Sequence, residues 1–241
     1  MVAKCRRFAR KAEASVNPFK IVDDFENAVA SYTGAPYCVA VNSCTNALFL
    51  CLMWEVEKAA RVFAASGGIY AAKELPESIE IPKHTYIGVA QSILNADFNV
   101  SFRDESWNGS YRLKPFDLFD AAKMFTSNMY IRHIDDKINY SGEPIFVCTS
   151  HHWTKILGIQ QGGCILHNDM EANIWLRKAR FDGRTPRLPA SRETQPIRGW
   201  HMYMSPEIAA EGLVRLAGLP LDNPPQPMDN YPDLSKMDIF Q

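Results

Sequence analysis

The sequence lacks the features that mark membrane proteins and nucleic-acid-binding proteins. No apolar run approaches the roughly 20 residues of a membrane-spanning helix, and no apolar signal segment follows the start. An excess of one charge is also missing, because 26 Lys and Arg oppose 27 Asp and Glu for a formal net charge of -1. A chain with this balance of charge lacks the excess of basic residues that is typical of proteins that bind nucleic acid. We therefore expect a protein of the cytoplasm that uses neither a membrane nor nucleic acid.

Cysteine pairs with metal-ligand or redox spacing are missing as well. The six cysteines form no C-x-x-C pair, and several lie inside apolar runs, as buried free thiols do in a reducing compartment. The six histidines form no ligand-spaced set with cysteine or carboxylate, so we expect no metal site. One basic cluster, residues 4–12, is typical of a solvated helix, although it could also contact an anionic surface or a partner subunit.

What the sequence does contain is a regular alternation of strand and helix patterns. Its 241 residues, 46% hydrophobic, suit one globular domain, which we place at residues 1–220, followed by a proline-rich tail at 221–241. Alternating elements predict an α/β fold with a mostly parallel sheet and helices on both faces. Helical spacing indicates helices at 18–32, 45–65, 85–97, 170–181 and 206–219, and short apolar runs indicate strands at 37–41, 78–82, 98–102, 116–120, 145–150 and 163–166.

The most informative stretch is FVCTSHHWTKILGIQQGGCIL, residues 146–166, which places Lys155 in a polar loop between two apolar strands. A lysine held between buried strands has a lowered pKa, and the neutral amine is the form that attacks carbonyl groups. An ordinary solvated lysine on a connecting loop is the alternative. The decision depends on whether the rest of a binding site is present in the chain.

Three further positions could complete such a site. The turn VNSCTNAL leads from a strand into a helix at Cys44 and Thr45, where free N–H groups suit a phosphate, although a simple helix cap has the same pattern. Tyr86 lies at a strand–helix junction, where it could stack on a flat ring or pack in the core. Asp120 ends a buried strand, where it could hold a proton on a ligand or cap a turn.

These positions, in this order, resemble a known family. Five blocks carry the resemblance over residues 18–219: FENAVASYTGAPYCVAVNSCTNALFL, IPKHTYIGVAQSILNAD, LFDAAKMF, the spacing from Ser150 to Lys155 and Gly162-Gly163, and LRKARFDGR followed by GWHMYMSPEIAAEGL. They are similar to blocks of the DegT/DnrJ/StrS family of nucleotide-sugar aminotransferases, which are fold-type-I enzymes that use pyridoxal 5'-phosphate (PLP). No single motif is specific, but the ordered set is.

The resemblance implies a role for each candidate residue. Cys44 and Thr45, together with the hydroxyl of Ser150, would bind the PLP phosphate, and Tyr86 would stack on the pyridine ring. Asp120 would pair with the pyridinium nitrogen and so let the ring accept electrons. Lys155 would form the internal aldimine and shuttle the proton as general acid and base.

The resemblance also implies an activity and an assembly. The expected reaction moves an amino group from an amino-acid donor, by family resemblance glutamate, to a nucleotide-linked keto-sugar in amino-sugar biosynthesis. A homodimer with shared active sites is expected, with GWHMYMSPEIAAEGL as the contributing segment. Two alternatives stay open. One is sugar deoxygenation, in which a His replaces the Schiff-base lysine; the other is a non-catalytic descendant that binds a sugar nucleotide or a partner protein.

The chain departs from the family pattern at several points. Cys44 replaces the usual Gly or Ala, Lys123 stands where Gln or His is usual, and Tyr203 stands where Arg or Asn is usual. The segment from Tyr86 to Asp120 is short, so we expect a strand–helix unit to be missing. The chain also stops soon after the helix at 206–219, so the fold is expected to be a reduced large domain whose small C-terminal domain is largely missing.

Overall fold

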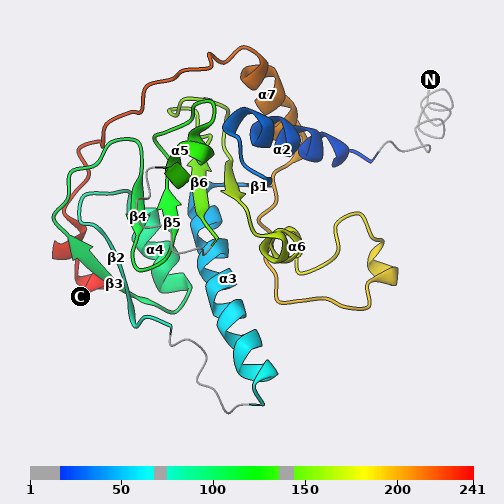
Figure 1. Cartoon of the computed structure of the whole chain (residues 1–241), viewed down its shortest axis with the longest axis horizontal. Helices are drawn as coiled ribbons and strands as arrows, with labels where there is room; N and C mark the ends of the chain where they lie inside the picture. Colours follow the sequence, from blue (N-terminus) through cyan, green and yellow to red (C-terminus); the bar gives the residue numbers. More distant parts are fainter. Residues whose placement is uncertain (1–16, 68–74, 136–143) are drawn as a thin grey trace, which may run out of the picture.

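The computed structural model describes residues 17–67, 75–135 and 144–241. The basic cluster at 4–12 therefore lies outside the described residues. Within them, five strands form one sheet in the order β1-β7-β6-β5-β4, and β2 pairs with β3 beside it (Figure 1). The bounds are β1 Tyr37–Val41, β2 Ser78–Pro82, β3 Asn99–Arg103, β4 Tyr111–Leu113, β5 Leu118–Asp120, β6 Phe146–Ser150 and β7 Gly163–His167.

The sheet is mixed, which corrects the expected mostly parallel pairing. β6 runs parallel to β5, whereas β7 is antiparallel to both of its neighbours and β4 is antiparallel to β5. A single antiparallel bridge between Glu80 and Lys114 connects β2 to β4, and β2 and β3 are parallel to each other. Consequently β1, β2, β3, β5 and β6 all point the same way, and their carboxyl ends meet at one edge.

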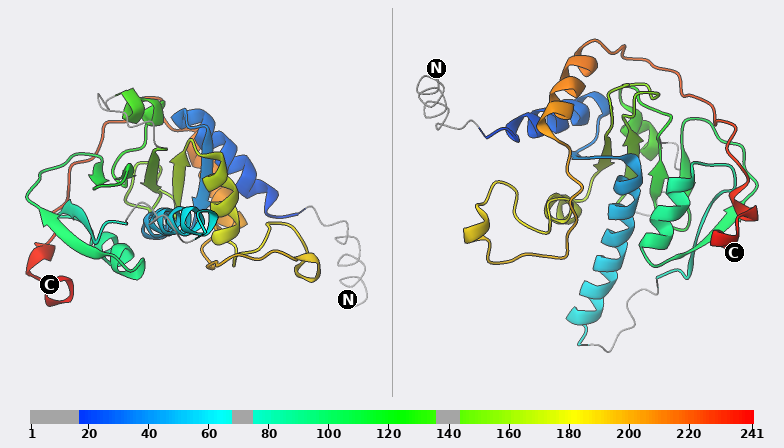
Figure 2. Two further views of the ribbon diagram at one scale, coloured as in Figure 1. Left: turned by 60° about the horizontal axis from the view of Figure 1, so that its bottom comes forward. Right: turned by 180° about the vertical axis from the view of Figure 1, so that it is seen from behind.

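Helices cover both faces of the sheet, as the sequence predicted (Figures 1 and 2). One face carries α3, α4 and α6, and the other carries α2, α5 and α7. The bounds are α2 Lys20–Thr33, α3 Cys44–Ala65, α4 Ile87–Asn95, α5 Met129–Asp135, α6 Met170–Ala179 and α7 Pro206–Ala217. Side-chain caps begin three of these helices: Ser43 for α3, Asp169 for α6 and Ser205 for α7.

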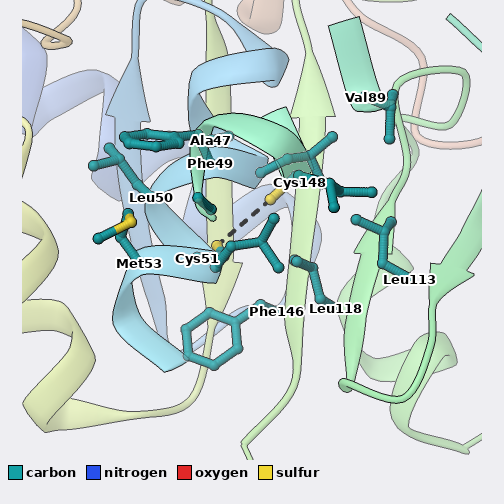
Figure 3. Packing of buried hydrophobic residues seen from close by; sticks show 14 of the residues in the cluster. Ala47, Phe49, Leu50, Cys51, Met53, Val89, Leu113, Leu118, Phe146 and Cys148 are labelled. Atoms are coloured by element: carbon teal, nitrogen blue, oxygen red, sulfur yellow. Dashed lines mark hydrogen bonds between the residues drawn. The ribbon is translucent and has the colours of Figure 1, made fainter. Parts of the chain in front are cut away.

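Strand side chains alternate between two apolar clusters, which is why the strands read as continuous apolar runs. In β1, Val39 and Val41 belong to the cluster under α3, whereas Cys38 and Ala40 belong to the cluster under α2 and α7. Figure 3 shows part of the first cluster, where Cys51 of α3 meets Cys148 of β6 with their sulfur atoms 3.7 Å apart. The five described cysteines are all buried free thiols, as expected from the apolar runs around them.

A buried ion-pair network fastens the β1 edge of the sheet to helices on both faces. Glu26 of α2 is only 1% exposed, and its Oε1 atom accepts a hydrogen bond from the Ala40 N–H at 2.8 Å. Arg180 also pairs with Oε1, whereas Arg177 pairs with Oε2 at 2.6 Å. Because every member has a partner, the charge is tolerated in the interior.

The structure describes every residue from Asn99 to Asp120. Between β3 and β5 this segment forms only the short strand β4 and contains no helix. This agrees with the missing strand–helix unit expected from the short segment. Beyond α7, the described residues contain only two short 3₁₀ turns, Leu234–Lys236 and Asp238–Phe240. The expected reduced large domain is therefore confirmed, and the described residues after α7 add no further α-helix or strand.

The carboxyl-terminal tail is packed against the domain. It leaves α7 and crosses the molecule to the β2–β3 side, as the orange-to-red trace in Figure 1 shows. Leu234 is fully buried, and Phe240 is 9% exposed and packs edge-on against Phe102 of β3. The division into a domain at 1–220 and a tail at 221–241 stays a prediction, but the two parts share one core.

Candidate functional site

A cavity of about 470 Å³ opens at the edge of the sheet where the carboxyl ends of β1, β2, β5 and β6 meet. Ligands of open α/β sheets bind at this edge, because the loops that leave the strands converge there. All six residues expected to form a site line this one cavity: Cys44, Thr45, Tyr86, Asp120, Ser150 and Lys155. Lys123 lines it too.

The start of α3 supplies backbone donors to the cavity. Ser43 caps the helix, since its hydroxyl accepts a hydrogen bond from the Asn46 N–H at 3.1 Å. Cys44 and Thr45 are the first residues of the helix, so their N–H groups have no carbonyl partner within it. The helix dipole adds positive potential at the same place. This turn can bind an anionic group such as a phosphate.

Gly163 holds this turn close to the sheet. A Cβ atom on Gly163 would lie 2.7 Å from the Cys44 nitrogen and 2.6 Å from the Thr149 carbonyl oxygen, both of which are rigid backbone atoms. Only glycine therefore allows β7, β6 and the start of α3 to approach so closely. Its neighbour Gly162 lines the cavity and forms a bridge with Ser43.

The Cys44 side chain points into the protein rather than serving as an anion donor. Its sulfur atom lies 3.8 Å from Asp120 Oδ1 and 3.6 Å from the Cys148 carbonyl oxygen. Burial, and then the nearby Asp120 charge, raise the pKa of the Cys44 thiol well above its usual range. The thiol therefore stays protonated, and Cys44 contributes its backbone to the site.

Asp120 is fixed by a chain of hydrogen bonds that the sequence did not reveal. The Tyr111 hydroxyl donates to Asp120 Oδ2 at 2.7 Å, and the Thr85 hydroxyl oxygen lies 2.5 Å from that of Tyr111. The Ala122 N–H donates to Asp120 Oδ1 at 2.9 Å. Burial raises the pKa of Asp120, and the hydrogen bond from Tyr111 opposes this shift. A carboxylate held in this way can face a cationic ligand group in one orientation.

Lys155 is the half-buried amine of the cavity. Burial, and then the charge of Lys123, lower the pKa of Lys155, whereas Asp229, Asp120 and Cys44 act in the opposite direction. A lowered pKa increases the fraction of neutral amine, which is the nucleophilic form. Ser150 lies in the same cavity at the end of β6. The arrangement can therefore bind a carbonyl compound that also carries an anionic group.

Two residues of the carboxyl-terminal tail, Asp229 and Tyr231, also line the cavity, as does Trp107. Asp229 accepts a hydrogen bond from Lys123 Nζ at 2.7 Å. Tyr231 stacks on Trp107 with 6.4 Å between ring centroids, and burial raises the pKa of Tyr231 well above the usual range. The sequence analysis missed these three residues, since a proline-rich tail and an irregular loop carry no periodic signal. The acidic and aromatic residues inside that tail are the only signal that could have indicated them.

Tyr86 lies at the mouth of the cavity and is 56% exposed. A Cβ atom on Gly88 would meet the Tyr86 ring at 2.6 Å and the Thr45 hydroxyl at 2.8 Å, so the glycine makes room for both side chains. The ring therefore has a free face beside the start of α3, where a flat ligand could stack.

Tyr203 lies outside this cavity. It packs edge-on against Phe19 at 5.4 Å and tilted against Phe181 at 4.8 Å, measured between ring centroids. With these rings it lines a second cavity of about 500 Å³, whose lining also includes residues of the loop between α6 and α7. Within one chain, Tyr203 and Lys155 are therefore not brought together.

Two other classes of site find no support in the part of the chain that the structure describes. No helix there combines the length and apolar composition needed to cross a bilayer. No group of three or more His, Cys, Asp or Glu side chains there is arranged to hold a metal ion.

Comparison with known families agrees with the resemblance found in the sequence. The DegT/DnrJ/EryC1/StrS aminotransferase family matches residues 6–108, somewhat less than half of the 241 residues. This part of the chain holds the turn at Cys44 and Thr45 together with Tyr86. No curated protein is similar enough in sequence to match the chain.

Solved structures of sugar-modifying enzymes share the fold. A mutant GDP-4-keto-6-deoxymannose-3-dehydratase (ColD) with bound GDP-perosamine has a TM-score of 0.60 at 17% identity, over 83% of this chain and 61% of its own. The sugar aminotransferase CalS13 from Micromonospora echinospora has a TM-score of 0.55 at 18% identity, over 82% and 61%. The E. coli GDP-4-keto-6-deoxy-D-mannose-3-dehydratase with bound hydrated PLP has a TM-score of 0.59 at 17% identity, over 83% and 60%. The chain thus has the fold-type-I architecture and spans about three fifths of these enzymes.

Proposed function

We propose that the protein is a PLP-dependent aminotransferase that moves an amino group from an amino acid to a nucleotide-linked keto-sugar. One observation carries this proposal: Lys155, a half-buried amine with a lowered pKa, shares a cavity with the anchored carboxylate of Asp120. An activated amine and a fixed carboxylate are the two groups that bind the aldehyde and the ring nitrogen of PLP. The family match and the shared fold support the same cofactor.

The residues of the cavity fit PLP in their chemistry. The N–H groups of Cys44 and Thr45, with the Ser150 hydroxyl, would hold the phosphate, and the Tyr86 ring offers a face for the pyridine. Gly163 and Gly88 allow the turn at Cys44 and Thr45 and the Tyr86 ring to take these places, because a Cβ atom on either glycine would collide with them. The cavity is also large enough for the cofactor and part of a substrate, since it measures about 470 Å³.

The roles of the protein groups follow from this placement. Bound PLP supplies an electron sink, which makes a Cα–H bond of an amino acid acidic. Asp120 would keep the ring nitrogen protonated, since Tyr111 and Ala122 hold its carboxylate in place. Lys155 would hold the cofactor and would carry the proton as general base and acid, a role usually worth about 10²–10⁴-fold in rate.

The substrate assignment rests on the family match and on the relatives' own substrates. One relative is solved with GDP-perosamine bound, and another is a sugar aminotransferase. We infer a nucleotide-linked keto-sugar as acceptor and an amino acid, glutamate by family resemblance, as donor. A homodimer is part of this proposal, because a chain that spans about three fifths of its relatives has less material to enclose a substrate.

Dehydration of a keto-sugar is the second candidate, because two of the three similar structures described above are dehydratases. Both chemistries would use the same ring-nitrogen carboxylate and phosphate turn. Lys155 favours transamination, because the proton must return through a basic amine and the resemblance places a His at this position in the dehydrating branch. A non-catalytic sugar-nucleotide-binding or protein-binding role is the third candidate, which the shorter chain would favour.

Spectroscopy of the purified protein with PLP tests the proposal. We expect a visible absorption band that borohydride removes, and peptide mapping should place the reduced adduct on Lys155. Lys155→Ala should lose the band, whereas Lys20→Ala should keep it, because Lys20 is an exposed residue that pairs with Asp24 on α2. Glutamate should then change the spectrum, and a keto-sugar nucleotide should restore it.

The outcomes separate the three candidates. A spectrum restored by the keto-sugar with an aminated product supports transamination, whereas a deoxygenated product supports dehydration. A protein that binds no PLP would contradict both catalytic candidates, whereas one that binds PLP without forming an adduct at Lys155 would contradict transamination.

A further inference from the structure

The carboxyl-terminal tail forms one wall of the cavity. Its backbone is held to the domain by the Gln226 N–H donating to the Lys123 carbonyl at 2.9 Å and the Gly109 N–H donating to the Gln226 carbonyl at 3.0 Å. Further along, the Leu234 N–H donates to the Lys83 carbonyl at 3.0 Å. These bonds fix the tail on both sides of Asp229. The position of Asp229 is therefore set by the fold.

Asp229 faces the second lysine of the cavity. Its carboxylate accepts a hydrogen bond from Lys123 Nζ at 2.7 Å, and the Lys123 side chain is only 7% exposed. Hydrogen bonding to Lys123 lowers the pKa of Asp229, so this carboxylate is charged at neutral pH. An ammonium so deeply buried is costly without such a partner.

Two amines therefore face one cavity. The charged and titratable groups that act on Lys155 are Lys123, Asp229, Asp120 and Cys44. A cavity with two neutral amines would offer an aldehyde two points of attachment. An ammonium held in an ion pair has no lone pair with which to attack a carbonyl.

We propose that Asp229 is a positioning residue that keeps Lys123 in an ion pair, so that Lys155 alone reacts with the cofactor aldehyde. The proposal rests on the proposed PLP-dependent function and assigns a role to the tail. Asp229 acts through Lys123, because its carboxylate binds Lys123 Nζ at 2.7 Å. The selectivity between the two lysines thus comes from the carboxyl-terminal tail, in which Asp229 lies more than 70 residues after Lys155.

The test is the location of the reduced PLP adduct in variants. In this reaction an amine adds to the aldehyde carbon and its oxygen leaves as water, and hydride from borohydride then gives a secondary amine. In the wild-type protein we expect the adduct on Lys155 only. In Asp229→Asn and Asp229→Ala we expect a substantial share of the adduct on Lys123. In Lys155→Ala the adduct should be absent, and in Lys155→Ala with Asp229→Ala it should return on Lys123.

Controls separate this role from a general effect on structure. Asp233→Asn changes another carboxylate of the same tail, which bonds to Ser235 and does not line the cavity, so its adduct should stay on Lys155. Asp229→Glu, which retains the charge, should restore attachment to Lys155 alone. Circular dichroism should show that each variant is folded.

The outcomes distinguish this proposal from the proposed function. If the wild-type protein forms no adduct at Lys155, the proposed function fails. If the wild-type adduct lies on Lys155 and Lys123 stays unmodified in every Asp229 variant, including those that lack Lys155, the role of Asp229 is refuted and the function stands.

Discussion

At the scale of single residues, the clearest prediction concerns the substitution of Asp120. Its Oδ2 atom accepts from the Tyr111 hydroxyl, and its Oδ1 atom accepts from the Ala122 N–H and the more distant Cys44 thiol. In an Asn the amide oxygen can keep the bonds at Oδ1, and the NH₂ group can donate to the Tyr111 hydroxyl oxygen. We expect Asp120→Asn to fold and bind PLP, because the phosphate turn is untouched. Turnover should fall on the order of a hundredfold, since an amide cannot hold the ring proton by charge. The measurement is the rate of the half-reaction with glutamate beside the PLP dissociation constant.

Tyr111→Phe provides a graded comparison for this prediction. It removes the hydroxyl that lies between Thr85 and Asp120 but keeps the carboxylate. A smaller loss of turnover is expected from this change than from Asp120→Asn. Near-normal half-reaction rates in Asp120→Asn would show that the carboxylate does not serve the ring nitrogen.

Two buried histidines make stability sensitive to acid. Burial lowers the pKa of His151 to about 3 and that of His167 to about 4. In the unfolded chain both histidines have the usual pKa near 6.5. Between pH 6.5 and about pH 4 the unfolded state therefore binds more protons than the folded state. Stability is therefore fully present above pH 6.5 and decreases as the pH falls. From pH 7 to pH 5 we expect a loss of about 2 kcal/mol for each histidine, measured by urea unfolding.

His167→Phe tests the contribution of one of these groups. His167 stacks on Phe146 with 5.4 Å between ring centroids, so a second aromatic ring suits the site. The variant should lose roughly half of the histidine-linked stability change between pH 7 and pH 5. An unchanged dependence on pH would exclude His167 as a source of the acid sensitivity.

Part of the site was accessible from the sequence and part was not. Lys155 and Asp120 could be predicted, because each ends or follows a short apolar strand and their order along the chain is informative. Tyr111 and Thr85 could not, since their bonds to Asp120 depend on how β4 and the loop after β2 pack. Asp229 reaches the cavity only through the course of the tail, which no local pattern encodes.

At the scale of elements, the close contact of β7, β6 and the start of α3 depends on Gly163. We expect Gly163→Ala to lower the free energy of unfolding by about 1–3 kcal/mol, because a Cβ atom would overlap two rigid backbone atoms. The added Cβ atom should also displace the turn at Cys44 and so weaken PLP binding. Urea unfolding and a PLP titration measure the two effects.

Gly218→Ala is the matched control. A Cβ atom there would have only the Arg215 carbonyl oxygen nearby, at 3.8 Å, and the backbone φ of -99° is open to any residue. Its effect on stability should stay within about 0.5 kcal/mol. Equal effects of the two substitutions would show that the contact at Gly163 is not tight.

The elements themselves were mostly predictable from periodicity. The strands Tyr37–Val41 and Ser78–Pro82 match the predicted ranges. The short strand β4 and the helix α5 were missed, because three residues of YRL and the seven residues of α5 are too few to show a period. The antiparallel direction of β7 was missed as well, because the sequence of the loop that holds Lys155 does not specify the direction in which the next strand enters the sheet.

At the scale of the whole molecule, the chain spans about three fifths of the enzymes that share its fold, and one cavity brings its candidate site residues together. The tail closes one side of this cavity, and the loop between α6 and α7 projects from the rest of the described structure in the views of Figures 1 and 2. The segment that we expected at a dimer interface is partly used within the subunit. Trp200 packs edge-on against Phe49 at 5.0 Å between ring centroids, and Met204 is only 1% exposed.

Because other residues of this segment pack within their own subunit, Tyr203 is the residue that best tests the proposed dimer. It lies outside the cavity of its own chain, so any contribution to a site with Lys155 must come from a partner subunit. A homodimer with a two-fold axis would place two such contributions symmetrically. Light scattering at micromolar concentration should therefore give twice the chain mass of 27.2 kDa.

Mixing two inactive variants tests whether the sites are shared. Lys155→Ala should lack activity because the amine is missing, and Tyr203→Ala should impair substrate or cofactor binding while remaining dimeric. When equal amounts are unfolded together and refolded, half of the dimers are hybrids. If Tyr203 acts across the interface, one of the two sites in each hybrid is intact, and the mixture should regain about a quarter of wild-type activity. Absence of recovery would show that Tyr203 acts only within its own chain, and an active monomer would refute the shared site altogether.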